Sequence, residues 1–257
     1  MKGQLPNRIL ITGASSGLGA ALARHYAAPG LTLLLWGRDR QRLDAVAASC
    51  RGAGAEVAVR SLDLSDSAAA IDAIGQDDDA GAIDLALFVA GMGDTRAPGD
   101  LVEDAVQVAR LGLVNFVAAA ALAAAISNRM ARRGEGRIVL VGSAAGFHAL
   151  PFAAAYAGSK AGIARFAQAL RLGVKQYGVG VTLVSPGFID TAGGRKAPGA
   201  RPFALRSSDA AARIAKAAAR GQTHAIFPWP FVVMRWVDRL LPRALRDRLL
   251  LALTPQG

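Results

Sequence analysis

Short apolar runs of strand length alternate with helix-length segments along most of the chain. The apolar runs lie at residues 8–12, 31–36, 56–62, 83–89, 137–141, 179–185 and 224–227. The segments between them that suit helices lie at residues 20–28, 39–50, 67–74, 101–109, 113–130, 152–176 and 208–219. Right-handed crossovers place helices on both faces of a parallel sheet. The alternation therefore predicts a doubly wound α/β fold with seven parallel strands.

The strand pattern ends at Phe227, and a segment of different character follows it. We expect residues 1–227 to form one domain, because 53% hydrophobic and 19% charged residues suffice for a single large core. Residues 228–257 are expected to form a C-terminal helical appendage in which Pro242 separates two amphipathic pieces. Tryptophan and arginine beside apolar residues at 229–253 suit contact with a membrane surface. Packing over a substrate pocket or against a second subunit explains the same pattern.

The positive charge is concentrated near the C-terminus. The formal net charge is +11, and residues 191–257 hold 12 basic and 3 acidic side chains, against 18 and 16 in the first 190 residues. This distribution disfavours a nucleic-acid-binding protein, whose basic surface would extend over the whole domain. It indicates an anionic partner near the C-terminus, either acidic lipid headgroups or a negatively charged substrate.

Cysteine content and hydropathy indicate a cytoplasmic protein. The single Cys50 excludes an internal disulfide, and residues 1–12 lack the long apolar core of a secretory signal. The uncharged run at 111–128 is mostly alanine with Asn115 in its middle, and the run at 225–234 has only ten residues, so neither predicts a transmembrane helix. Three dispersed histidines and one cysteine predict no metal site.

Glycines follow the first predicted strand. The segment reads Thr12-Gly13-Ala14-Ser15-Ser16-Gly17-Leu18-Gly19. Glycines let the backbone approach a pyrophosphate, and the helix that follows offers unpaired N–H groups and the positive end of its dipole. A tight turn without a ligand is the alternative. The position of the turn after the first strand of an alternating chain favours a dinucleotide-binding (Rossmann) domain.

The end of the second predicted strand indicates which dinucleotide binds. Gly37 and Arg38 stand where NAD-dependent enzymes usually carry a carboxylate, and an arginine can pair with the 2′-phosphate of NADP. This favours NADP(H) over NAD(H), with Arg40 able to share the role. Asp39 is a competing ribose ligand, but we interpret it as the N-cap of the next helix. A solvated Arg38 without a ligand is the remaining alternative.

Tyr156 and Lys160 are four residues apart in a predicted helix and therefore share one face. An ammonium group there can lower the pKa of the phenol from about 10, so that tyrosine exchanges a proton with an alcohol or a carbonyl. Such a pair on its own is more often a helix-surface contact. The chain has 5 lysines against 25 arginines, so a basic residue chosen by composition alone would be arginine.

These features together resemble the short-chain dehydrogenase/reductase family, in its common form of roughly 250 residues. The resemblance covers residues 5–227 and rests on the glycine turn, on Asn115 within Val-Asn-Phe, on Ser143 thirteen residues before Tyr156, on Tyr156-Ala-Gly-Ser-Lys160, and on Ser185-Pro186-Gly187. It implies hydride exchange between a nicotinamide and a carbonyl or secondary alcohol, which NADP use would direct towards reduction.

The resemblance also implies roles for individual residues. Tyr156 is expected to be the general acid/base, Ser143 to hold the substrate oxygen, Lys160 to bind the nicotinamide ribose and lower the pKa of Tyr156, and Asn115 to hold a proton-relay water. His148, in a loop that borders the substrate pocket, is either a substrate contact or an exposed histidine without a role. The cofactor is expected to contact Gly13, Ser15, Ser16, Gly17, Leu18, Gly19, Arg38, Asp63, Leu64, Ala90, Gly91, Tyr156, Lys160, Pro186, Gly187, Ile189 and Thr191.

The sequence departs from the family at Val89, where an asparagine commonly ties the central strands together. We expect Val89 to cost some hydrogen bonding without touching the chemistry. A catalytically idle NADP-binding regulator is the alternative function, but the intact set of Asn115, Ser143, Tyr156 and Lys160 argues against it. The apolar helix at 113–130 suits the family's usual homodimer or homotetramer contact. Residues 193–202 are expected to form a mobile loop.

Overall fold

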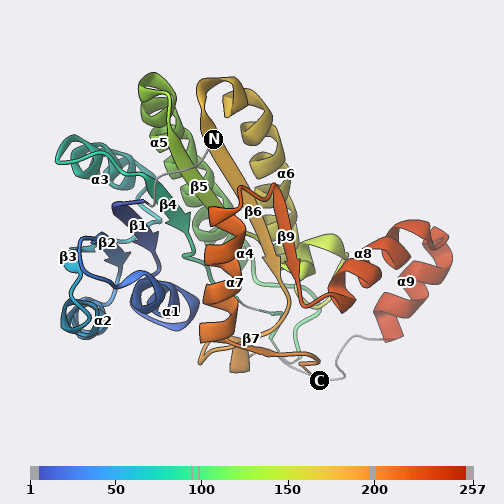
Figure 1. Cartoon of the computed structure of the whole chain (residues 1–257). Helices are drawn as coiled ribbons and strands as arrows, with labels where there is room; N and C mark the ends of the chain where they lie inside the picture. The colour runs from blue at the N-terminus through green and yellow to red at the C-terminus, as the bar shows by residue number, and fades with distance from the viewer. Residues whose placement is uncertain (1–5, 94, 98, 197–200, 253–257) are drawn as a thin grey trace.

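The computed structural model describes residues 6–93, 95–97, 99–196 and 201–252, without the side chains of Lys196, Asp238 and Arg239 (Figure 1). Its centre is a seven-stranded sheet in the order β3-β2-β1-β4-β5-β6-β9, in which every neighbouring pair is parallel. The strands are β1 (Arg8–Thr12), β2 (Thr32–Gly37), β3 (Glu56–Ser61), β4 (Leu85–Phe88), β5 (Gly136–Val141), β6 (Val179–Pro186) and β9 (His224–Phe227). The predicted doubly wound fold is confirmed.

Helices cover both faces of this sheet. On one face lie α1 (Gly17–Tyr26), α2 (Arg40–Gly52) and α7 (Ser207–Ala219), which pack on Ile9 and Ile11 of β1. On the other lie α3 (Ser67–Asp79), α5 (Ala119–Arg133) and α6 (Ala154–Val174), which pack on Leu10 of the same strand. Because successive strand side chains point to opposite faces, burial on both faces explains why the strands read as continuous apolar runs.

One long helical stretch combines two predicted helices. It consists of α4 (Ala105–Gly112), a π-helical turn η1 (Leu113–Ala118) and α5. The helix starts at Ala105, later than the predicted residue 101, because the side chain of Asp104 caps it by accepting the N–H of Gln107 at 2.9 Å. Among the described residues, this stretch alone has the length and mean hydropathy, 1.8, of a membrane span. Its α5 part lines the sheet core, and a core helix passes the same test, so this is weak evidence for a span.

Other element boundaries also differ from the sequence prediction. Helix α1 begins at Gly17 and not at residue 20, because the last glycines of the turn are already helical. Helix α3 continues to Asp79, five residues beyond the predicted end. Asp39 caps α2 by accepting the N–H of Arg42 at 3.0 Å, as we interpreted it.

Two helices follow the last strand of the sheet, and a short two-stranded ladder precedes α7. The helices α8 (Pro230–Leu240) and α9 (Arg243–Ala252) come after β9, with Pro242 between them as expected, and they project beyond this edge strand (Figure 1). Strands β7 (Ile189–Asp190) and β8 (Leu205–Arg206) pair at the base of the predicted mobile loop. Residues 197–200 of that loop lie outside the described residues.

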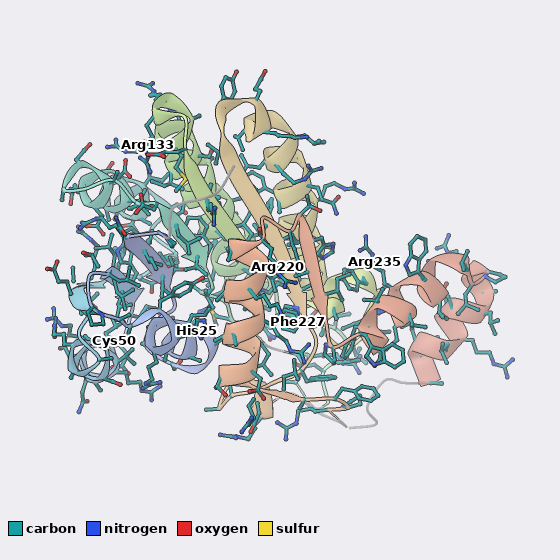
Figure 2. All side chains as sticks on the ribbon, in the orientation of Figure 1. His25, Cys50, Arg133, Arg220, Phe227 and Arg235 are labelled. Atoms are coloured by element: carbon teal, nitrogen blue, oxygen red, sulfur yellow. The ribbon has the colours of Figure 1, made fainter. Side chains whose placement is uncertain are left out.

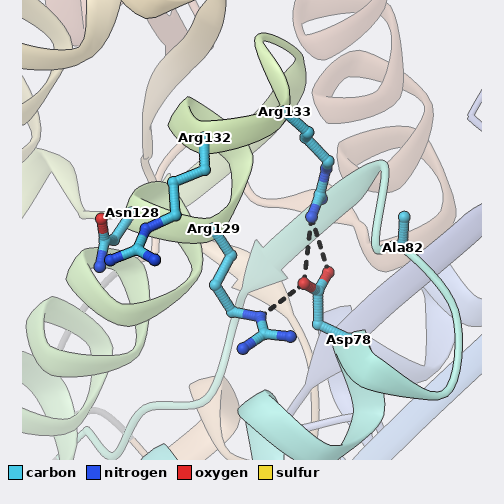
Figure 3. A pocket seen from close by; sticks show the side chains of 6 residues that line it. All are labelled: Asp78, Ala82, Asn128, Arg129, Arg132 and Arg133. Carbon is cyan, nitrogen blue, oxygen red and sulfur yellow. Dashed lines mark hydrogen bonds and ion pairs between the residues drawn. The ribbon is translucent and has the colours of Figure 1, made fainter.

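An ionic cluster joins α3 to α5 near the amino ends of β4 and β5 (Figure 3). Asp78 is buried, and its carboxylate accepts bonds from Arg129 at 2.6 Å and from Arg133 at 3.0 Å. Burial alone would raise the pKa of Asp78, but these arginines and the N–H of Ile83 hold it below its usual value. The carboxylate therefore stays ionised, and the cluster fixes the two helices on the sheet.

Candidate active site

The predicted site residues gather at the carboxyl ends of the central strands. Strand β1 lies between β2 and β4, so the crossovers that leave β1 and β4 run in opposite directions. In open α/β sheets, ligands bind in the crevice that this reversal leaves outside the strand ends. The glycine turn follows β1, Ala90 and Gly91 follow β4, and Ser143 follows β5.

The glycine turn packs too closely for larger residues. Gly13 has φ +69°, and a Cβ on it would lie 2.8 Å from the Cα of Ala90. A Cβ on Gly19 would collide with the carbonyl of Gly13. At Gly17, with φ +53°, a Cβ would lie 3.2 Å from a methyl carbon of Thr191. The turn after β1 thus meets the segments after β4 and β7, and its exposed backbone faces the crevice.

Thr12 connects β1 to β4 at this point. Its hydroxyl oxygen accepts the N–H groups of Val89 at 3.0 Å and of Ala90 at 3.2 Å. We expected Val89 to leave the central strands short of hydrogen bonds, because it replaces the family's asparagine. The buried Thr12 provides a tie between these strands that the sequence reading did not identify.

Arg38 and Asp63 lie at the carboxyl ends of β2 and β3. Arg38 is exposed, and its backbone carbonyl accepts a bond from the hydroxyl of Ser61 at 3.1 Å. Asp63 accepts bonds from the backbone N–H and the hydroxyl of Ser65, and these bonds, with the charge of Arg38, lower its pKa. The next residue, Leu64, is buried. An exposed guanidinium and an ionised carboxylate are therefore available at this end of the crevice.

Asn115 lies in the π-helical turn, a deviation often found at functional sites. Its side chain is 2% exposed. The amide donates to the carbonyl of Met92 at 2.8 Å and to the hydroxyl of Ser159 at 3.2 Å, and its oxygen accepts the N–H of Met92 at 2.7 Å. Asn115 thus joins the segment after β4 to helix α6. Its role in holding a relay water stays a prediction.

Ser143, Tyr156 and Lys160 form one connected group. Ser143 caps the short 3₁₀ helix η2 (Ala144–Phe147), and its hydroxyl is hydrogen-bonded to the side chain of Tyr156. One helical turn after Tyr156, the Nζ atom of Lys160 lies 5.9 Å from the centre of the phenol ring and donates to the carbonyl of Val141 at 3.0 Å. Lys160 is 5% exposed.

Burial changes the pKa of both Tyr156 and Lys160. It raises the pKa of the Tyr156 phenol, and the bond to Ser143 offsets only part of this effect. It lowers the pKa of Lys160 to about 8. The net shift of the Tyr156 pKa is therefore upward and not downward as expected, because desolvation is its largest cause. A phenol that keeps its proton at neutral pH is a proton donor, which suits reduction of a carbonyl.

The 3₁₀ helix also carries an aromatic contact with the C-terminal segment. His148 follows η2 directly and lies edge-on to the ring of Phe147, with 6.3 Å between ring centres. Arg235 lies on the neighbouring helix α8 (Figure 2), and its guanidinium is 4.9 Å from the centre of the Phe147 ring. Contact of His148 with a substrate stays a prediction, whereas the Arg235 contact was not foreseen from the sequence.

Helix α8 also packs on the segment after β6. Its Phe231 is 6% exposed, and a Cβ on Gly187 would collide with the Phe231 ring. Beneath it, Nε2 of His224 lies 2.9 Å from the hydroxyl of Ser185, and burial with the charge of Arg235 lowers the His224 pKa to about 4. His224 is thus neutral at neutral pH. Through Arg235 and Phe231, α8 thus contacts the segments that hold Ser143 and Gly187.

No group of three or more His, Cys, Asp or Glu side chains within the described part of the chain is placed to hold a metal ion. His25 lies against Tyr26, and Cys50 of α2 is buried in the core.

Comparison with known proteins identifies the family. The model of the short chain dehydrogenase family matches residues 7–201. The chain belongs to this family. An uncharacterised oxidoreductase of Myxococcus xanthus is 34% identical over 93% of this chain and 94% of its own length. An uncharacterised oxidoreductase of Mycobacterium tuberculosis is 33% identical over 96% of this chain and 98% of its own.

Solved structures agree with this assignment. A short-chain dehydrogenase from Sphingobium yanoikuyae in complex with NADPH has a TM-score of 0.79 and 30% identity, over 93% of this chain and 98% of that one. A bulky-bulky ketone specific alcohol dehydrogenase from Comamonas testosteroni has a TM-score of 0.77 and 27% identity, over 94% and 97%. This short-chain dehydrogenase is thus an oxidoreductase with the seven-stranded fold of its family, and the resemblance inferred from its motifs is confirmed.

Proposed function

We propose that this short-chain dehydrogenase reduces the carbonyl group of a small molecule with NADPH, with Tyr156 as the general acid. The observation that carries the proposal is the hydrogen-bonded pair of Ser143 and Tyr156 beside the buried ammonium of Lys160. The complex of the Sphingobium relative with NADPH supports the choice of cofactor.

The residues present fit a dinucleotide at the strand ends. The crowded glycine turn offers its backbone to a pyrophosphate, and Arg38 offers a cation to a 2′-phosphate. Asp63, Leu64, Ala90 and Gly91 would lie along the adenosine half, and Pro186, Gly187, Ile189 and Thr191 along the nicotinamide half. When bound, NADPH supplies the hydride that the carbonyl carbon receives.

Side chains of the protein bind the substrate's carbonyl oxygen and supply the proton that it receives. The hydroxyl of Ser143 and the phenol of Tyr156 donate hydrogen bonds to the carbonyl oxygen, which polarises the carbonyl group. Tyr156 transfers its proton to the alkoxide oxygen as negative charge develops there, and the Lys160 ammonium stabilises the phenolate left behind. Asn115 holds the Met92 backbone and α6 in register, which keeps this group in position.

We propose a ketone with bulky substituents as the substrate class. The Comamonas relative is named for ketones that are bulky on both sides. In this chain, Phe147 and Phe188 place aromatic rings on the two segments that follow Ser143 and Gly187, which suits lipophilic groups. The Arg235 guanidinium over Phe147 adds a cation near the same wall, which would favour a substrate that also carries negative charge.

The test is NADPH oxidation by the purified protein with a panel of ketones of increasing size, with and without a carboxylate. Turnover that rises with substituent size supports the proposal. Binding of NADPH without turnover on any ketone or, in reverse, on any secondary alcohol would instead identify a catalytically idle NADP-binding regulator.

A prediction about Arg38 tests the cofactor preference. Replacing Arg38 with Ala removes the cation proposed to pair with the 2′-phosphate, and bonds to charged groups contribute about 1.5–3 kcal/mol. We expect the KM for NADPH to rise about 10- to 100-fold while the KM for NADH stays unchanged. Steady-state kinetics with both cofactors measure this. Arg42→Ala is the control, because Arg42 is exposed in α2, the helix that follows Arg38, but is paired with Asp39 at 3.1 Å. An equal rise for both cofactors would contradict the assignment.

We further propose a cytoplasmic homodimer or homotetramer. Several large apolar side chains are exposed on α4, η1 and α6, namely Val106, Val108, Leu113, Val117 and Leu172. Exposed apolar side chains on these helices suit contact with a second copy through the helices that carry Asn115 and Tyr156. Light scattering of the purified protein measures the assembly, and a monomeric mass would contradict it. We also propose separate roles for residues 1–227, as the catalytic domain, and for residues 228–257, as a C-terminal appendage.

A further inference from the structure

Helix α8 has an inner face that packs on the sheet domain and an opposite face that is exposed. Phe231 and Arg235, one helical turn apart, face the sheet domain and contact Gly187 and Phe147. Opposite this inner face, five large apolar side chains are exposed by between 44% and 79%. They are Trp229, Val233, Trp236, Val237 and Leu240. At 100° per residue (3.6 residues per turn), these five centre about 180° from Phe231.

Helix α9 extends this exposed surface. Leu245, Leu249 and Leu251 are exposed by between 46% and 65%. We call these three residues and the five on α8 the outer face. If α8 rotated about its axis to bury these exposed side chains, its inner face, which now packs on the domain, would become exposed instead. Exposed large apolar side chains gathered on two successive short helices indicate a site of contact with a partner.

The charges around the outer face indicate what that partner is. Residues 228–257 contain five arginines and two aspartates, and one of the arginines, Arg235, belongs to the inner face. Asp247 lies 3.6 Å from Arg243 and 3.5 Å from Arg246, so two of these cations share one carboxylate. Tryptophan and leucine beside excess arginine is the composition of segments that lie in the headgroup region of a bilayer, where acidic lipids attract the cations.

A second copy of the chain fits this surface less well. In a two-fold contact the same surface occurs on both partners, so the two net positive segments would face each other across the interface. An anionic bilayer instead complements the charge and buries the apolar side chains.

We propose that the outer face of α8 and α9 docks on the surface of an anionic lipid bilayer. The inner face of α8 meanwhile contacts the segments that hold Ser143 and Gly187, so docking through the outer face places the site on the membrane side of the domain. A lipophilic ketone dissolved in the membrane would then reach Tyr156 without crossing bulk water. This last consequence rests on the proposed function, whereas the docking itself does not.

The first experiment is flotation of the full chain with two kinds of vesicle, phosphatidylcholine alone and phosphatidylcholine mixed with phosphatidylglycerol. Attraction contributes about 1 kcal/mol per basic residue near the surface, so we expect at least about tenfold stronger binding to the anionic vesicles, weakened by salt. Equal binding to both vesicles, or none to the anionic ones, would overturn the proposal.

Variants locate the contact. Trp236→Glu places a charge in the centre of the outer face, and because Trp236 is exposed the chain should still fold. We expect it to reduce binding to anionic vesicles at least about tenfold, since it removes an interfacial tryptophan and repels the lipid. Tyr177→Glu, at an exposed aromatic residue remote in sequence from α8, is the matched control and should bind as the wild type. Arg243→Glu with Arg248→Glu tests the charge separately and should remove the preference for anionic vesicles.

Two further measurements distinguish docking on a bilayer from contact between copies of the chain and from the proposed catalysis. If Trp236→Glu lowers the mass of the assembly in light scattering while vesicle binding is unchanged, the outer face is a contact between copies and the proposal is wrong. Vesicle binding needs no turnover, so a protein that binds vesicles but reduces no ketone would contradict the proposed function and leave the docking intact.

Discussion

Replacing Tyr156 with Phe is expected to lower kcat for ketone reduction by about 10²- to 10⁴-fold, the usual contribution of a positioned general acid. The variant loses the phenol proton that the structure keeps in place at neutral pH, and it loses the bond to Ser143. The ring and its packing on α6 remain, so NADPH binding should change little. Stopped-flow or steady-state NADPH oxidation measures kcat, and quenching of protein fluorescence measures cofactor binding.

Tyr177→Phe is the matched control, because it removes a hydroxyl from an exposed tyrosine on the turn after α6. It should retain the wild-type kcat. Undiminished turnover by the Tyr156→Phe variant would show that another group supplies the proton, and the assignment of the catalytic residues would fail. A parallel loss of NADPH binding would instead indicate that the substitution disturbs the site as a whole.

The fold could be predicted because the restrictions on it are local and repeated. Each strand of a doubly wound sheet is buried on both faces, so each shows as a short apolar run, and the right-handed crossover fixes what lies between. The glycine turn could also be predicted from the sequence, because Gly13 and Gly19 lie where the structure leaves no space for a Cβ. Such steric limits determine which residue type can occupy a position, so they are visible in the sequence.

Contacts between distant segments could not be predicted in the same way. Thr12 ties β1 to β4 by accepting two backbone N–H groups, which imposes no spacing on the sequence. The position of Arg235 over Phe147 joins residues 88 positions apart, and many arginines in this chain could have filled that role. Which face of α8 turns inward depends on such contacts, so the amphipathic pattern alone left membrane, pocket and subunit contacts open.

The pKa of Tyr156 shows a second limit of sequence reasoning. The spacing of Tyr156 and Lys160 placed the two groups on one helical face, and in the structure Nζ of Lys160 lies 5.9 Å from the centre of the Tyr156 ring. The sequence does not show that Lys160 is buried and Tyr156 half-buried, and desolvation shifts the pKa values of the two groups in opposite directions. Electrostatic effects at a site depend on solvent exclusion by the whole fold.

Lys160 gives the second large prediction. Replacing it with Met should lower kcat for reduction by at least about 10²-fold, because no cation remains to stabilise the Tyr156 phenolate. The same change should stabilise the protein at neutral pH. The pKa of Lys160 is lowered by burial from 10.5 to about 8, so holding its charge in the fold costs about 3 kcal/mol. Loss of the bond to the Val141 carbonyl offsets part of this gain.

The pH dependence of the stability difference is the decisive measurement. Below pH 8, Lys160 is charged in both the folded and the unfolded chain, and the wild type bears the full cost of its burial. Between pH 8 and about 10.5 the unfolded chain binds more protons, so the wild type gains stability relative to the Met variant as pH rises. Denaturant unfolding across this range should therefore show the advantage of Lys160→Met shrinking. Lys175→Met, at an exposed lysine of the following turn, should show no such trend. A difference that is constant with pH would mean that Lys160 is not held charged in a desolvated site.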